Sequence, residues 1–77
     1  MAKRKRYYVN PRPDGKWEVK AEGASRASSV HDRKQDAVQQ GRQIARRHRP
    51  SQLIIKKQDG TIQAEYTYGK DPYPPRG

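Results

Sequence analysis

Binding of polyanions is the chemistry that the ionisable residues of this 77-residue chain could perform. Lysine and arginine number 18 and aspartate and glutamate 8, so the formal net charge is +10. Residues 1–6 and residues 32–50 each carry a net charge of +4, whereas the rest of the chain is nearly neutral. Two short segments therefore need a functional explanation, and nucleic acid is the obvious polyanionic partner.

The second basic segment spaces its long polar side chains three or four residues apart. One flank of a helix there would carry Gln35, Gln39, Arg42, Arg46 and Arg49, with Arg33, Lys34 and Arg47 nearby. A guanidinium group suits phosphate because it forms two parallel hydrogen bonds and loses its water readily. We predict contacts to DNA or RNA phosphates from Arg42, Arg46, Arg47 and Arg49. The alternative is a solvated helix face that keeps a weakly hydrophobic protein soluble.

The first basic segment is a short leader that contains Lys3, Arg4, Lys5 and Arg6. Such a leader can follow a phosphate backbone without reading bases, or it can be a solubilising tail. Tyr7 and Tyr8 follow it directly and would offer rings on which unpaired bases stack. One of two consecutive strand tyrosines must point inward, however. We interpret Tyr66 and Tyr68 as core or rim residues.

Catalytic and metal-binding arrangements are not indicated. The eight carboxylates are scattered, and His31 and His48 lie 17 residues apart with no second ligand three or four residues away. The chain has no cysteine, which excludes disulfides and thiolate metal sites and fits a reducing cytosol. We therefore predict no enzymatic activity, no cofactor and no metal. No apolar stretch has the length of a signal peptide or a membrane span, so the predicted location is cytoplasmic, with no membrane partner.

Two β-hairpins are predicted from alternating strands and their turns. Tyr7–Asn10 and Lys16–Glu22 flank a turn with Asp14-Gly15, and Leu53–Ile55 and Thr61–Tyr68 flank a turn with Asp59-Gly60. The two-residue period places Trp17, Val19 and Ala21 on one face of the first hairpin. On the second, the shared face is expected to hold Ile62, Ala64, Tyr66 and Tyr68.

One amphipathic helix is predicted between the hairpins, after a loop at residues 24–31. Asp32 is expected to cap it, with Gln35 completing a capping box, and Pro50 to end it. A stripe spaced by three and four residues should face the sheet: Ala37, Val38, Gly41, Ile44, Ala45 and His48.

These elements predict an α+β fold of the order ββαββ, with an antiparallel-type sheet covered on one face by the helix. The predicted organisation is a basic flexible leader at residues 1–6, a single domain at 7–69 and an extended Pro-rich segment at 70–77. That last segment contains a PxxP spacing in Pro72-Tyr73-Pro74-Pro75, which either packs on the sheet or binds a partner.

Several strings resemble a family of small bacterial proteins catalogued as domain of unknown function number twenty-one eighty-eight. The strings are Asp14–Val19, Glu22–His31, Leu53–Ile55, Asp59–Ile62 and Tyr68–Gly77, and the resemblance covers residues 7–77. It implies a small domain without an assigned activity, substrate or cofactor. The arginine-rich helix and the basic leader depart from the family's pattern, which weakens the transfer of function from the family to this chain.

The sequence therefore predicts a small basic accessory protein that binds nucleic acid through phosphates with low sequence specificity. The alternative is a protein-interaction or stress-related structural domain whose charge serves only solubility. Its partner would be another protein, or a second copy of the chain joined through an open sheet edge.

Overall fold

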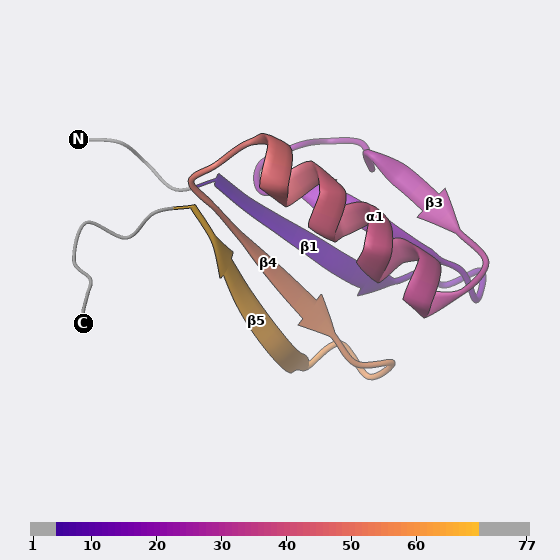
Figure 1. Cartoon of the computed structure of the whole chain (residues 1–77). Helices are drawn as coiled ribbons and strands as arrows, with labels where there is room; N and C mark the ends of the chain where they lie inside the picture. The colour runs from indigo at the N-terminus through magenta and orange to yellow at the C-terminus, as the bar shows by residue number, and fades with distance from the viewer. Residues whose placement is uncertain (1–4, 70–77) are drawn as a thin grey trace.

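One helix lies across one face of a five-stranded sheet (Figure 1). The computed structural model describes residues 5–69. In chain order the elements are β1 (Lys5–Pro11), β2 (Trp17–Ala21), β3 (Ser29–His31), α1 (Lys34–Arg47), β4 (Ser51–Lys56) and β5 (Ile62–Tyr68). Their order across the sheet is β3-β2-β1-β4-β5. The two predicted hairpins are confirmed, because β1 pairs with β2 and β4 with β5 in antiparallel register.

The expectation of an antiparallel-type sheet in a ββαββ fold is wrong, because β1 and β4 pair in parallel. Tyr7 lies opposite Leu53, and Val9 lies opposite Ile55. The chain crosses the face of the sheet through α1 and returns beside β1 in the same direction, which is the connection that parallel strands require. An uninterrupted apolar run such as Leu53–Ile55 is typical of a strand buried on both faces. The fold is α+β with a mixed sheet.

The predicted loop at residues 24–31 contains a third strand, β3, which pairs with β2 through Trp17 opposite His31 and Val19 opposite Ser29. Because β3 runs to His31, Asp32 is not the helix cap. The Asp32 carboxylate lies 3.7 Å from the Lys16 ammonium, and the N-cap is Arg33, with extended backbone and no side-chain capping bond. The predicted capping box is therefore wrong.

The core lies between α1 and the helix-facing side of the central strands. Its buried members from the sheet are Tyr7, Val9, Trp17, Val19, Leu53 and Ile55. The predicted helix stripe is largely confirmed: Ala37, Gly41 and Ala45 are buried, and Val38 and Ile44 are half-buried. A Cβ atom at Gly41 would lie 2.9 Å from Leu53 Cδ1, so the glycine permits the close approach of helix and sheet. His48 is exposed, with its ring 6.2 Å from that of Tyr7.

The edge strand β5 lies to the side of α1, which packs mainly over β1, β2 and β4 (Figure 1). A register shift at Ile55/Lys56 places Ile62 opposite Lys56, so Ile62 does not share a face with Ala64, Tyr66 and Tyr68 as expected. Ile62 is 53% exposed. The same bulge lets Gln63 reach α1, where its Oε1 accepts a hydrogen bond from the Lys34 ammonium.

Both hairpin turns are closed by an aspartate. The Asp14 carboxylate accepts a hydrogen bond from the backbone N–H of Lys16 (3.0 Å), and this bond, with Arg12 beside it, lowers the pKa of Asp14. Asp59 accepts hydrogen bonds from the hydroxyl (2.7 Å) and backbone N–H (3.0 Å) of Thr61, which lower the pKa of Asp59 below 3.8. The next residues, Gly15 and Gly60, adopt positive φ.

We expect Gly41→Val to lower the free energy of unfolding by about 1–3 kcal/mol, because the added methyl groups meet Leu53 in a closed core. Urea unfolding measures the change. Gln43→Val, at an exposed position of the same helix, should cost about 0.5 kcal/mol or less. If both variants lose the same free energy of unfolding, the close approach of α1 to the sheet at Gly41 is contradicted.

We expect Thr61→Val to raise the pKa of Asp59 toward 3.8, because the variant lacks the hydroxyl donor and keeps the backbone N–H. A carboxyl pKa that is lower in the folded state contributes stability above the unfolded pKa, which is lost as the pH falls through the folded pKa. In the variant, the folded-state pKa of Asp59 should lie closer to the unfolded value. The pH range over which this stability is lost should therefore become narrower. Carbon-13 titration of the carboxyl group measures the pKa, and Thr67→Val, on β5, should leave it unchanged.

Candidate nucleic-acid interface

Lys5, in the described part of the first basic segment, lies beside the end of the second basic segment. The backbone N–H of Lys5, the first residue of β1, donates a hydrogen bond of 3.1 Å to the carbonyl of Pro50, which precedes β4. A hollow of about 330 Å³ lies at this junction and is lined by Lys5, Arg47, His48, Arg49 and Pro50. We call Lys5, Arg46, Arg47 and Arg49 the basic end.

The position of the basic end depends on how α1 stops. The hydroxyl of the fully buried Ser51 donates a hydrogen bond of 2.6 Å to the carbonyl of Ala45. The backbone N–H of His48 also bonds that carbonyl, at 3.3 Å, and the carbonyl of Ile44, at 3.1 Å. The Ser51 bond attaches the last turn of the helix to the start of β4, and the His48 bonds close that turn. Arg46 and Arg47, in that turn, are exposed.

Among the described residues, the predicted helix arginines form no ion pair with an acidic side chain. Within residues 5–69, the salt bridges join Arg6 to Glu22, Arg12 to Asp14 and Glu18, and Lys16 to Asp32. None includes Arg42, Arg46, Arg47 or Arg49. Of the leader, Lys5 and Arg6 belong to β1, and Arg6 is in part neutralised by Glu22 at 3.5 Å. Lys3 and Arg4 lie outside the described residues.

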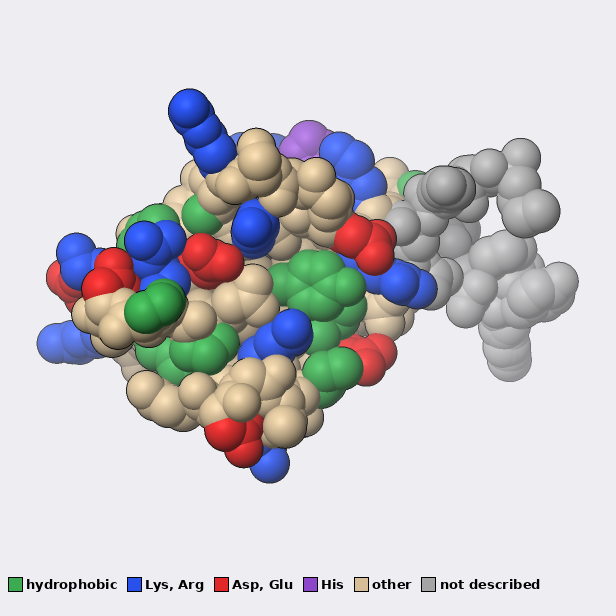
Figure 2. All heavy atoms as spheres, turned by 180° about the vertical axis from the view of Figure 1, so that it is seen from behind, with side chains coloured by type: hydrophobic (Ala, Val, Ile, Leu, Met, Phe, Trp, Pro, Cys, Tyr) green, Lys and Arg blue, Asp and Glu red, His purple; other side chains and the backbone are tan. Residues whose placement is uncertain are grey.

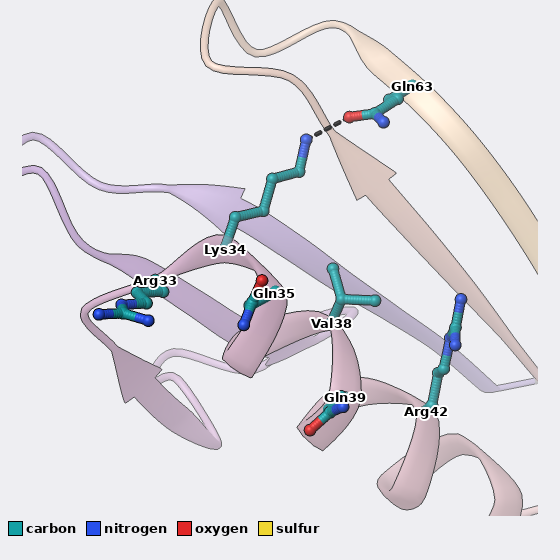
Figure 3. Close-up of a pocket in the computed structure, with 7 residues that line it drawn as sticks. All are labelled: Arg33, Lys34, Gln35, Val38, Gln39, Arg42 and Gln63. Atoms are coloured by element: carbon teal, nitrogen blue, oxygen red, sulfur yellow. Dashed lines mark hydrogen bonds between the residues drawn. The ribbon is translucent and has the colours of Figure 1, made fainter.

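Arg42 is separate from the basic end, on the flank of α1 that faces β5. It is half-buried, and its guanidinium lies 5.3 Å from the centre of the Tyr66 ring. Beside it is a groove of about 670 Å³, which we call the α1–β5 groove (Figure 3). Its lining residues are Arg33, Lys34, Gln35, Val38, Gln39, Arg42 and Gln63. Lys34, Val38 and Arg42 point from α1 toward β4 and β5, and Gln63 faces Lys34 from β5 (Figure 3).

The groove continues toward the basic end. A second hollow, of about 280 Å³, is lined by Gln39, Arg42, Gln43 and Arg46, so it shares Gln39 and Arg42 with the groove. Arg46 belongs to both this hollow and the basic end. Lys34, at the start of this path, also lies 5.0 Å from the centre of the Trp17 ring.

Of the residues that line the groove, only Arg42 was among the predicted contacts. Gln63 and Tyr66, both on β5, were not predicted contacts either. Lys34 was noted only as a neighbour of the arginine flank, and Tyr66 was interpreted as a core or rim residue. Tyr66 is 41% exposed. The alternation of residues along β5 indicates the face of the sheet on which Tyr66 lies. Nothing in the sequence indicates the bulge that brings Gln63 to α1.

The face of the sheet opposite α1 has a different character. Figure 2 shows hydrophobic side chains near its centre, with basic and acidic side chains around them. Several of its polar groups are paired: Asn10 Nδ2 donates to Glu18 (3.1 Å), and Gln52 Nε2 donates to Glu65 (2.8 Å). The Lys56 ammonium lies 5.2 Å from the centre of the Tyr8 ring. Because Glu18 and Glu65 bring negative charge to this open face, it is a poor surface for a polyanion.

Across residues 5–69, no group of three or more His, Cys, Asp or Glu side chains is placed to hold a metal ion. None of the helices in that range is long and apolar enough to cross a membrane.

A family model described as "uncharacterized protein conserved in bacteria (DUF2188)" matches residues 7–68, which include β2, β3, α1, β4 and β5 and most of β1. The chain belongs to the DUF2188 family. Its helix arginines and the groove lie within the matched range, whereas Lys3 to Arg6 precede it. The resemblance inferred from the sequence strings is confirmed for the family, over a range that stops before the Pro-rich ending.

One relative of this DUF2188 chain is the uncharacterized protein YdaT of Bacillus subtilis (strain 168), which is 38% identical over 53 residues. The aligned stretch covers 69% of this chain and 35% of YdaT, so the chain spans about a third of that relative. No solved structure matches the chain.

We expect Ser51→Ala to lower the free energy of unfolding by about 1 kcal/mol, because the Ala45 carbonyl loses its hydroxyl donor. Amide hydrogen exchange should accelerate at His48, which shares that carbonyl. Ser28→Ala, at an exposed position, is the control and should change neither quantity. Unchanged exchange at His48 in Ser51→Ala would show that the hydroxyl does not hold the helix end.

Proposed function

We propose that this DUF2188 chain binds the phosphate backbone of DNA or RNA with low sequence specificity. The contacts come from the basic end and from Arg42 of α1. The observation that carries the proposal is the hydrogen bond from Lys5 to the Pro50 carbonyl, because it joins the two basic segments into one surface. A surface of like charge attracts a polyanion more strongly than the same charges dispersed over the molecule.

The state of the arginines supports the proposal. Arg46, Arg47 and Arg49 are exposed and have no acidic partner among residues 5–69, so their guanidinium groups are available to phosphate oxygens. Binding of this kind releases counterions from the nucleic acid and carries little sequence information. Lys3 and Arg4 of the leader would extend the same contact.

A purely solubilising charge is the competing explanation, and salt dependence separates the two. Binding through about six to eight phosphates gives a slope of log K against log salt of about −5 to −7 on duplex DNA. The double variant Arg46→Gln/Arg47→Gln should flatten that slope by nearly 2, because two phosphate contacts are lost. Fluorescence anisotropy with a labelled duplex at several salt concentrations measures it.

The matched control is Arg26→Gln/Lys57→Gln. It removes the same net charge from two exposed positions, before β3 and after β4, that lie outside the proposed surface. We expect its slope to equal that of the wild type. Equal flattening in both double variants would show a response to net charge alone, and binding indifferent to salt would overturn the proposal.

A further inference from the structure

We propose that the α1–β5 groove receives the unpaired bases of a single strand, so that the chain binds single-stranded nucleic acid more tightly than duplex. This inference rests on the proposed phosphate binding and names the form of nucleic acid that the surface fits.

The chemistry of the lining supports a nucleotide as the occupant. Three cations, Arg33, Lys34 and Arg42, line the groove, and its lining contains no carboxylate. The remaining polar lining consists of Gln35, Gln39 and Gln63. A carboxamide both donates and accepts hydrogen bonds, as the edges of bases do, and so can pair with any base.

Arg42 and Tyr66 form a stacking platform at the side of the groove. The Arg42 guanidinium lies over the Tyr66 ring at 5.3 Å, and Tyr66 is 41% exposed on the uncovered edge strand. Unpaired bases stack on aromatic rings and on guanidinium planes, and each such contact contributes substantially to single-strand affinity. A planar base can therefore contact a guanidinium group and a ring that the protein already holds together.

The position of the groove explains why a single strand is favoured. In a duplex the faces of the bases are covered by their neighbours, so a duplex can contact the basic end but cannot place a base on Arg42 and Tyr66. The path from Lys34 to Arg46 follows α1 for about 18 Å, at 1.5 Å per residue. A strand lying along it would hold its bases in the groove and its phosphates at the basic end.

An acidic peptide is the alternative occupant, because it would also be drawn to the three cations. It has no planar base to stack, so its binding would not need the Tyr66 ring. The ring is therefore the feature to test.

The experiment compares Tyr66→Leu with the wild type for two labelled probes, an oligothymidylate and a duplex with the same number of phosphates. We expect the wild type to bind the oligothymidylate more tightly, and Tyr66→Leu to weaken that binding by about ten- to hundredfold while duplex binding is unchanged. Tyr66→Trp keeps a ring and should retain the single-strand affinity.

Tyr8→Leu is the matched control. Tyr8 also forms a cation–ring pair, with Lys56 at 5.2 Å, but on the open face of the sheet. We expect this variant to bind both probes as the wild type does. Circular dichroism and urea unfolding show that each variant is folded.

The outcomes separate the two proposals. If neither probe binds, the proposed function and this inference both fail. If both probes bind with the expected salt dependence but equally tightly, and Tyr66→Leu matches the wild type, the groove inference alone is overturned. It is also overturned if a glutamate-rich peptide displaces the oligothymidylate as effectively from Tyr66→Leu as from the wild type.

Discussion

The close seating of α1 on the sheet is the constraint on which the other features depend. Gly41 leaves room for the Leu53 side chain, so the helix axis settles over the central strands. Because α1 is centred there, it does not cover β5, and the flank that carries Lys34 and Arg42 becomes one wall of a groove. The same seating brings the last turn of the helix to Ser51 and so to the start of β1. Packing in the core thus decides where the charges lie.

Much of the fold followed from local signals in the sequence. Asp-Gly turns and alternating strands predicted both hairpins, and the helix stripe followed from its period. The predictions that were wrong concern features that depend on contacts between distant segments. The parallel pairing of β1 and β4 depends on the path of the chain across the sheet. β3 is only three residues long, and its register is set by β2 rather than by its own sequence. Because β3 extends to His31, the helix begins one residue later than expected, with Arg33 as an N-cap that makes no side-chain capping bond, and the predicted capping box does not form.

The candidate site was likewise predictable where it depends on local spacing, and not where it depends on contacts between distant segments. Helical spacing placed the arginines on one flank, but it could not show that Arg47 and Arg49 would lie beside Lys5, because more than forty residues separate them in the sequence. Nor could it separate Arg42 from the others. A cation in the last turn of a helix is stabilised by the helix dipole, which gives Arg46 and Arg47 a structural reason to be there. Arg42 lies in the middle of the helix and gains no such stabilisation.

Comparison of the two faces of the sheet shows why a cation beside a ring is not by itself a binding site. Lys56 over Tyr8 and Arg42 over Tyr66 are similar pairs with similar distances. On the face that carries Tyr8, polar groups are hydrogen-bonded to one another, as Gln52 is to Glu65, and the Glu65 carboxylate adds negative charge to that face. Arg42, the partner of Tyr66, lines a groove whose other polar side chains are cations and amides. Among residues 5–69, the cations of the groove therefore lie on the side of the sheet that α1 covers, which is the side on which we propose that a polyanion binds.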